Sequence, residues 1–195
     1  MTLIRSHILW RRLDLPGHEI STLDTRAGGW QLAGTALLAH KARPCRLDYR
    51  IECDADWQTR SVRIHGQVDD SPVRLDLLRS PSSEWQLNGV SVPAVDGCMD
   101  VDLGFSPSTN LLPIRRLAPA IGARVVVRAA WVRFPELSLE LLEQEYTRLD
   151  AYRYLYESAG GAFRRELLVN ADGFVLEYPD YWRAEGATST SEPVV

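Results

Sequence analysis

Short stretches in which apolar and polar residues alternate are the feature that most limits how this chain can fold. In residues 45–54 every second side chain from Leu47 to Cys53 is apolar, and the side chains between them are charged. Because successive side chains of a strand point to opposite faces of a sheet, this pattern predicts a strand with one buried face. Residues 61–69 repeat the pattern with Val62 and Ile64. The two stretches therefore form a predicted hairpin.

The same alternation recurs along most of the chain, with turn residues between the stretches. It predicts further strands at residues 7–14, 19–25, 29–40, 73–78, 85–92, 99–103, 124–134, 162–169 and 174–178. The last two are joined by the segment from Asn170 to Gly173, in which Asp-Gly supplies a positive φ at low cost. The predicted fold class is mainly β.

Two stretches have helical features. Residues 110–118 carry aliphatic side chains at helical spacing and a proline that a first turn tolerates, which predicts a short helix. In residues 137–150 leucines at odd positions fit a strand, whereas Leu142, Tyr146 and Leu149 recur at helical spacing. We favour a strand because tyrosines continue the series at even positions, and aromatic residues favour strands.

Composition and charge limit the size and the partners of the fold. The 195 residues are 45% apolar and 25% charged, which is ordinary for a globular protein. We predict one β-rich domain over residues 1–185 and a disordered tail over residues 186–195, which are mostly small and polar. The 22 basic and 26 acidic side chains give a net charge of −4 and are mixed along the chain. This mixture argues against nucleic-acid binding, which needs a concentrated cationic face.

The expected location is the cytoplasm. Basic residues such as Arg5 and Arg11 interrupt the first 13 residues before an apolar run of signal-peptide length can form. No apolar stretch approaches the roughly 18 residues of a membrane helix, so no integral membrane segment is expected. The cysteines Cys45, Cys53 and Cys98 are odd in number and lack C-x-x-C spacing. We expect them to be reduced thiols.

Motifs of catalysis and cofactor binding are missing from the sequence. The four histidines lie far apart, and no Walker loop, nucleophile elbow or dinucleotide-binding glycine pattern occurs. Carboxylates at alternate positions, such as Asp100 and Asp102, would share one strand face, and we favour a solvated face over paired acid–base groups. No catalytic residue, metal site or cofactor is predicted. Aromatic residues around Tyr178 and Trp182 suit either a sheet core or the wall of a pocket for an amphiphilic ligand.

Strings of aromatic, glycine and charged residues over nearly the whole chain are similar to those of a known family. They comprise residues 19–34 (EISTLDTRAGGWQLAG), residues 47–62 with Tyr49, Asp54, Trp57, Thr59 and Arg60, then Glu143-Gln144-x-Tyr146, Tyr154, Gly161-x-Phe163, Val169, Asp172-Gly173-x-Val175 and Tyr178-Pro179. Together they resemble the bacterial family described as putative glycolipid-binding. The motifs are scattered positions rather than one catalytic signature, and the resemblance brings no catalytic residue with it.

The resemblance implies a large, strongly curved antiparallel sheet that rolls into an incomplete barrel, with one or two short helices. The family is similar in architecture to bacterial lipoprotein carriers, whose open barrels shelter acyl chains. Those carriers work in the periplasm, whereas this chain shows no signal peptide, so we expect any lipid to be met on the cytoplasmic side.

The leading hypothesis is non-catalytic binding of a lipid or glycolipid in an apolar cavity of the curved sheet, with polar groups at its mouth. The candidate ligand-binding residues are Trp57, Arg60, Gln144, Tyr146, Tyr154 and Tyr178. Two alternatives remain open. One is a hydrolase-like enzyme that acts on a glycolipid or related ester through carboxylate or cysteine chemistry. The other is a protein-interaction scaffold whose sheet interior is filled. The oligomeric state stays undetermined.

Overall fold

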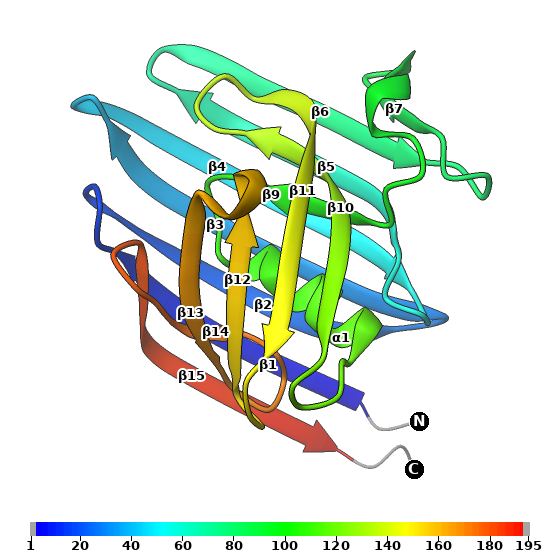
Figure 1. The fold of residues 1–195 in the computed structure, drawn as a ribbon. Helices are drawn as coiled ribbons and strands as arrows, with labels where there is room; N and C mark the ends of the chain where they lie inside the picture. The colour runs from blue at the N-terminus through cyan, green and yellow to red at the C-terminus, as the bar shows by residue number, and fades with distance from the viewer. Residues whose placement is uncertain (1–2, 193–195) are drawn as a thin grey trace.

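A computed structural model describes residues 3–192 and shows one sheet of fifteen strands within that range (Figure 1). The order is β8-β7-β6-β5-β4-β3-β2-β1-β15-β14-β13-β12-β11-β10-β9. Neighbouring strands are antiparallel except β9 and β10, which run parallel. The edge strands β8 and β9 do not pair with each other, so hydrogen bonds do not close the sheet. The predicted mainly β fold class is confirmed, with that parallel pair as an exception to the antiparallel pattern.

The first half of the sheet is a meander of long strands. Its strands are β1 (Leu3–Arg12), β2 (Gly17–Arg26), β3 (Gly29–His40), β4 (Arg43–Asp54), β5 (Thr59–Val68), β6 (Ser71–Arg79), β7 (Trp85–Leu87) and β8 (Val90–Ser91). The predicted hairpin is confirmed, because β4 and β5 pair antiparallel. The apolar side chains of β4 from Leu47 to Cys53 are buried, as their alternation predicted.

The second half holds the helical elements and the remaining strands. They are η1 (Pro93–Val95), β9 (Asp100–Leu103), η2 (Ser108–Asn110), α1 (Leu111–Leu117), β10 (Arg124–Arg133), β11 (Ser138–Arg148), β12 (Arg153–Ser158), η3 (Ala159–Gly161), β13 (Phe163–Val169), β14 (Val175–Tyr178) and β15 (Trp182–Glu192). The short helix predicted at residues 110–118 and the strand favoured over residues 137–150 are both confirmed.

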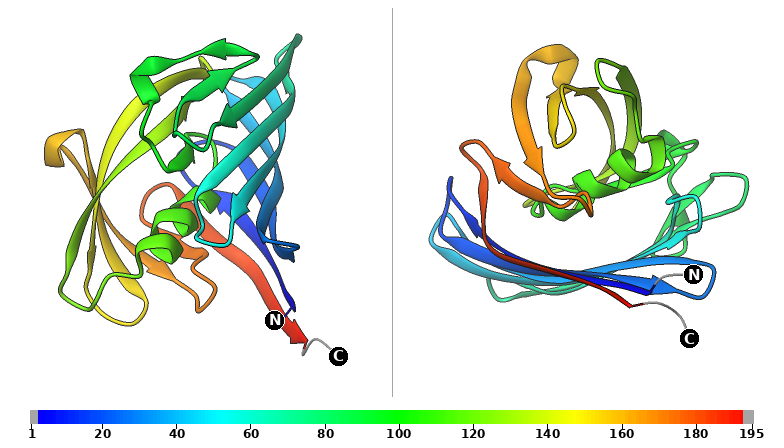
Figure 2. Two further views of the ribbon diagram at one scale, coloured as in Figure 1. Left: turned by 90° about the vertical axis from the view of Figure 1, so that its right-hand side faces the viewer. Right: turned by 90° about the horizontal axis from the view of Figure 1, so that it is seen from below.

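The sheet bends so that its two halves face each other. The long strands β1–β6 and β15 form a broad curved layer, and β10–β13 lie on its concave side with α1 between (Figure 2). Leu111 and Leu112 of α1 belong to the larger core cluster, which also contains Leu47 of β4. Ile114 belongs to a smaller cluster with Tyr146 of β11. The helix therefore packs into both cores.

One sequence prediction is wrong. Residues 186–192, predicted as part of a disordered tail, belong to β15, whose residues from Trp182 to Glu192 pair antiparallel with β1. The backbone amides and carbonyls of β1 pair with those of β15, and such a ladder forms with small and polar residues as well as with apolar ones. The rest of that predicted tail, residues 193–195, lies outside the described residues.

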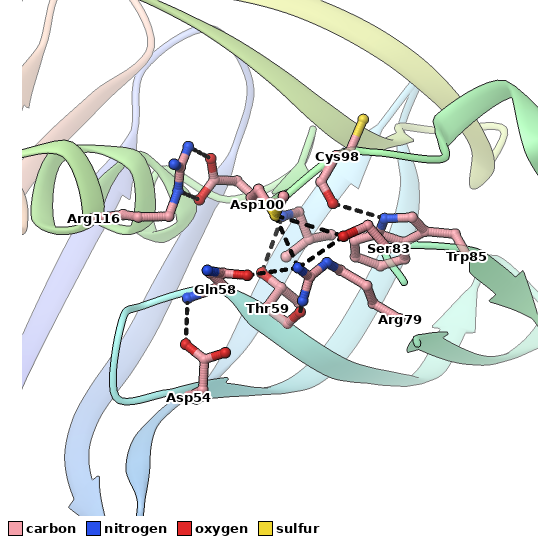
Figure 3. A network of polar contacts seen from close by, with 11 residues as sticks. Asp54, Gln58, Thr59, Arg79, Ser83, Trp85, Cys98, Asp100 and Arg116 are labelled. Carbon is pink, nitrogen blue, oxygen red and sulfur yellow. Dashed lines mark hydrogen bonds and ion pairs between the residues drawn. The ribbon is translucent and has the colours of Figure 1, made fainter. Parts of the chain in front are cut away.

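Polar contacts join the region around β9 to strands β5, β6 and β7 (Figure 3). The guanidinium of Arg79 donates to the carbonyl of Thr59 at 3.2 Å and to Oε1 of Gln58 at 2.6 Å. The hydroxyl of Thr59 accepts from the amide of Val101 at 3.2 Å. The indole of Trp85 donates to the carbonyl of Cys98 at 3.0 Å. Together with a backbone bond of 2.9 Å from the amide of Thr59 to the carbonyl of Met99, these contacts hold β9 close to β5, although the two strands form no ladder.

Candidate ligand-binding cavity

A cavity of about 380 Å³ lies where β9–β14 meet the end of β1 and the start of β15. Six aromatic side chains line it: Trp131, Tyr156, Phe163, Tyr178, Tyr181 and Trp182. Several of these rings contact one another edge to face, with centroids 5.9 Å apart for Tyr156 and Phe163 and 5.5 Å apart for Phe163 and Tyr181. Such pairs hold each ring in a fixed orientation. The rings therefore give the cavity a preformed aromatic surface.

One carboxylate faces this cavity. Asp102 is half-buried on β9, and its Oδ2 accepts a hydrogen bond of 2.7 Å from Nε2 of Gln144. The same Nε2 donates to the hydroxyl oxygen of Tyr156 at 3.1 Å. Burial raises the pKa of Asp102 to about 6, although the bond from Gln144 works in the opposite direction. Asp102 is therefore a hydrogen-bonding group whose charge changes close to neutral pH.

A second polar network lies behind the cavity. Oε1 of Glu19 accepts from the hydroxyl of Tyr49 at 2.7 Å and from Oγ of Ser106 at 2.5 Å. Ser106 also lines the cavity, which links the two. Burial raises the pKa of Glu19 to about 8, against the lowering effect of these hydrogen bonds and of Arg12. Glu19 therefore carries a proton at neutral pH in the folded protein.

Membrane-spanning helices and metal clusters do not occur in the part of the chain that the structure describes. None of its helices is long and apolar enough to cross a membrane. No three histidine, cysteine, aspartate or glutamate side chains within residues 3–192 are grouped so that they could hold a metal ion. The three cysteines are free and buried.

Comparison with protein families shows to which family the chain belongs. The family described as putative glycolipid-binding matches residues 7–184. The chain belongs to this family. The search of curated proteins found no match to this chain.

Two solved structures resemble this glycolipid-binding family member. A protein of the DUF1089 family from Pseudomonas aeruginosa is 38% identical, with a TM-score of 0.74 over 83% of this chain and 89% of that one. A β-barrel-like protein of the domain of unknown function DUF1849 from Brucella abortus is 11% identical, with a TM-score of 0.54 over 98% of this chain and 97% of that one. The second likeness concerns the fold alone.

The structure gathers three of the six predicted site residues at the cavity of this family member. Tyr178 lines it. Gln144 lies behind the wall and holds Asp102, while the buried Tyr146 donates from its hydroxyl to Oδ1 of Asn110 at 2.9 Å. Asn110 itself lines the cavity. A role of these residues in ligand binding stays a prediction.

The other three predicted residues lie elsewhere. Trp57 and Tyr154 line a second pocket of about 540 Å³. Arg60 is exposed on β5, where its Nε lies 3.7 Å from a carboxylate oxygen of Asp54. The six residues predicted as one site therefore lie in three places: at the aromatic cavity, at the second pocket and on the outer face of the sheet.

Sequence reasoning missed several cavity residues of this family member. Asp102, Trp131 and Phe163 were not proposed as ligand-binding groups, although all three line the cavity. The alternation of Asp100 and Asp102 was visible, but both were expected on a solvated face. The structure instead buries Asp100 against Arg116 and turns Asp102 toward the cavity.

Proposed function

We propose that the protein binds a glycolipid, with the sugar or an adjoining apolar segment inside the aromatic cavity, and does not transform it. One observation carries the proposal: a cavity walled by aromatic rings that also presents a fixed carboxylate, Asp102, held by Gln144. Family membership supports a binding role. Binding without chemistry suits a protein that carries or sequesters its ligand.

The mixture of groups in the cavity suits a sugar better than a bare hydrocarbon chain. A sugar ring has an apolar face of C–H groups, which packs on aromatic rings, and hydroxyls, which need hydrogen-bond partners. Asp102, Ser106 and Asn110 line the cavity and can supply such partners. A few polar groups placed among apolar walls, in a volume of about 300 to 1,000 Å³, are typical of small-molecule sites.

Neither alternative function gains a specific observation. A hydrolase that cleaves glycosidic bonds by the common mechanism uses two carboxylates across its cleft. Among the described residues, Asp102 is the one carboxylate that lines this cavity, because Glu19 lies behind Ser106. The cavity offers a ligand site that a scaffold with a filled interior does not need. The geometry therefore favours a container for a ligand.

Calorimetry with decyl glucoside below its micelle concentration tests the proposal. Leu142 lines the cavity, whereas Leu141 precedes it on β11 and is 37% exposed, so the two side chains point to opposite faces. We expect decyl glucoside to bind the parent protein and the Leu141→Gln variant alike. Leu142→Gln should weaken binding about tenfold, because a polar group then meets the apolar part of the ligand.

Two further probes separate the parts of the ligand. Decanol lacks the sugar, and glucose lacks the chain, so both should bind more weakly than decyl glucoside. Equal affinities of the Leu142→Gln variant and the parent for decyl glucoside would contradict the proposal.

A further inference from the structure

The second pocket lies at the other end of α1 from the aromatic cavity. Its wall combines the end of α1, the turn between β11 and β12, and the turn between β13 and β14. Two arginines, Arg115 and Arg148, and three aromatic residues, Trp57, Tyr152 and Tyr154, line it. No aspartate or glutamate lines it among the described residues. The lining therefore carries two positive charges without an acidic side chain to balance them.

Arg115 has an unusual environment for an arginine. Its guanidinium lies over the ring of Trp57, 4.9 Å from the centroid. Its stem packs against Gly173, where an added Cβ would approach Cδ of Arg115 to 3.3 Å. Within residues 3–192 no hydrogen bond or ion pair engages this guanidinium. Five N–H donors are thus held in place in the pocket with no protein acceptor.

The next residue along α1 shows the contrast. Arg116 donates from Nε and Nη2 to the two carboxylate oxygens of Asp100, at 3.0 and 2.6 Å (Figure 3). This is the bidentate pairing that arginine makes with a carboxylate or phosphate. The same helix therefore satisfies one arginine internally and leaves its neighbour, Arg115, facing the pocket.

Arg148 is fixed by the backbone instead of by a carboxylate. Its Nε and two Nη atoms donate to the carbonyls of Asp150, Pro119 and Ala151 at 3.0, 3.0 and 3.2 Å. These bonds leave its positive charge unneutralised and two N–H groups unused. The guanidinium lies 5.7 Å from the ring centroid of Tyr154. Burial raises the pKa of Tyr154, and the charges of both Arg148 and Arg115 oppose that rise, so both charges act at one place.

We propose that this pocket binds the anionic group of an amphiphile, a phosphate, sulfate or carboxylate, between Arg115 and Arg148, with an adjoining apolar or ring segment against Trp57 and Tyr154. Arg115 supplies the bidentate donors, and Arg148 supplies a fixed charge. The proposal does not depend on the aromatic cavity, because the two pockets share no lining residue.

Calorimetry with decyl phosphate and with inorganic phosphate tests the proposal. We expect decyl phosphate to bind the parent and to bind the Arg115→Gln variant at least about tenfold more weakly, since a charge-assisted bidentate pair is lost. Arg183→Gln is the matched control, because Arg183 is exposed on β15 outside the pocket. This variant should bind decyl phosphate as tightly as the parent does. Arg115→Lys keeps the charge without the planar fork and should bind with intermediate affinity.

The two probes distinguish the sources of the anion. Weaker binding of inorganic phosphate than of decyl phosphate identifies an amphiphile, and equal binding identifies a free anion at the same arginines. Leu142→Gln should leave decyl phosphate binding unchanged, so failure of this proposal and failure of the glycolipid proposal are separable. Equal decyl phosphate affinities of the parent and a folded Arg115→Gln variant would overturn the anion site, as would a lack of binding by both probes.

Discussion

Gln144 donates a hydrogen bond of 2.7 Å from Nε2 to Oδ2 of Asp102, two strands away in the same sheet. The bond links β11 to β9 across β10 and holds the carboxylate at the cavity wall. Because the same nitrogen also donates to Tyr156, one amide positions both a carboxylate and an aromatic ring of the site. The cavity is thus organised by a residue that does not line it.

Replacing Gln144 with leucine removes this donor at nearly constant volume. At pH 8 Asp102 is ionised, because its pKa is about 6. In the variant, Oδ2 of this carboxylate loses the hydrogen bond from Gln144. We expect the free energy of unfolding to fall by about 1 to 3 kcal/mol at pH 8. At pH 5 Asp102 is protonated, and the loss should be smaller. Urea denaturation at both pH values measures the difference, and an equal loss at the two would contradict this role.

Glu19 predicts a pH dependence of stability with a definite sign. Its pKa is about 8 in the folded protein and 4.5 ordinarily, so between these values the folded state holds a proton that the unfolded state releases. The contribution of Glu19 is fully present below pH 4.5 and declines as the pH rises to 8, by up to about 1.4 kcal/mol per pH unit. Glu19→Gln does not titrate and should gain stability relative to the parent over that range. Parallel stability curves of the two proteins from pH 4.5 to 8.5 would show that Glu19 is ionised when folded.

The neighbouring arginines of α1 should differ in their contribution to stability. Asp100 is buried, and Arg116→Met would leave its carboxylate without a cation, which costs about 3 to 5 kcal/mol. Arg115→Met should cost about 1 kcal/mol or less, because it removes a contact with Trp57 and no ion pair. Urea denaturation of both variants provides the comparison. Adding Asp100→Asn to Arg116→Met should recover part of the loss, and no recovery would mean that the stem of Arg116 matters more than its charge.

The cysteines should react slowly in the folded protein. Burial raises the pKa of Cys53 to about 12 and that of Cys98 to about 11, and the thiolate is the reactive form. All three cysteines are buried and free. At pH 8 we expect a disulfide reagent to label them only after urea is added. Rapid labelling of Cys53 in the native protein would contradict its burial.

Much of the fold could be predicted because strand alternation is local. The faces of β4 follow from the residue types alone, and Leu47 and Ile51 are buried as expected. The end of β15 has no such pattern, since residues 186–192 are mostly small and polar. Its place depends on pairing with β1, and backbone pairing partners are not visible in side-chain types.

The site was harder to predict because its members are distant in sequence. Gln144 and Asp102 are 42 residues apart, and only the sheet order brings them together. Trp57 and Arg60 seemed to belong to one motif, but Trp57 adopts a φ of 66° in its turn and stacks on Trp30, while Arg60 points outward. A positive φ is rare for an aromatic residue, so no sequence rule indicates this turn.

Native mass spectrometry of the protein purified from cells, followed by extraction and analysis of any bound lipid, tests the central claim most directly. We expect one sugar-bearing amphiphile per protein molecule, and much less of it on the Leu142→Gln variant than on Leu141→Gln. A protein that carries no ligand, and that takes up neither decyl glucoside nor an added glycolipid, would contradict the account.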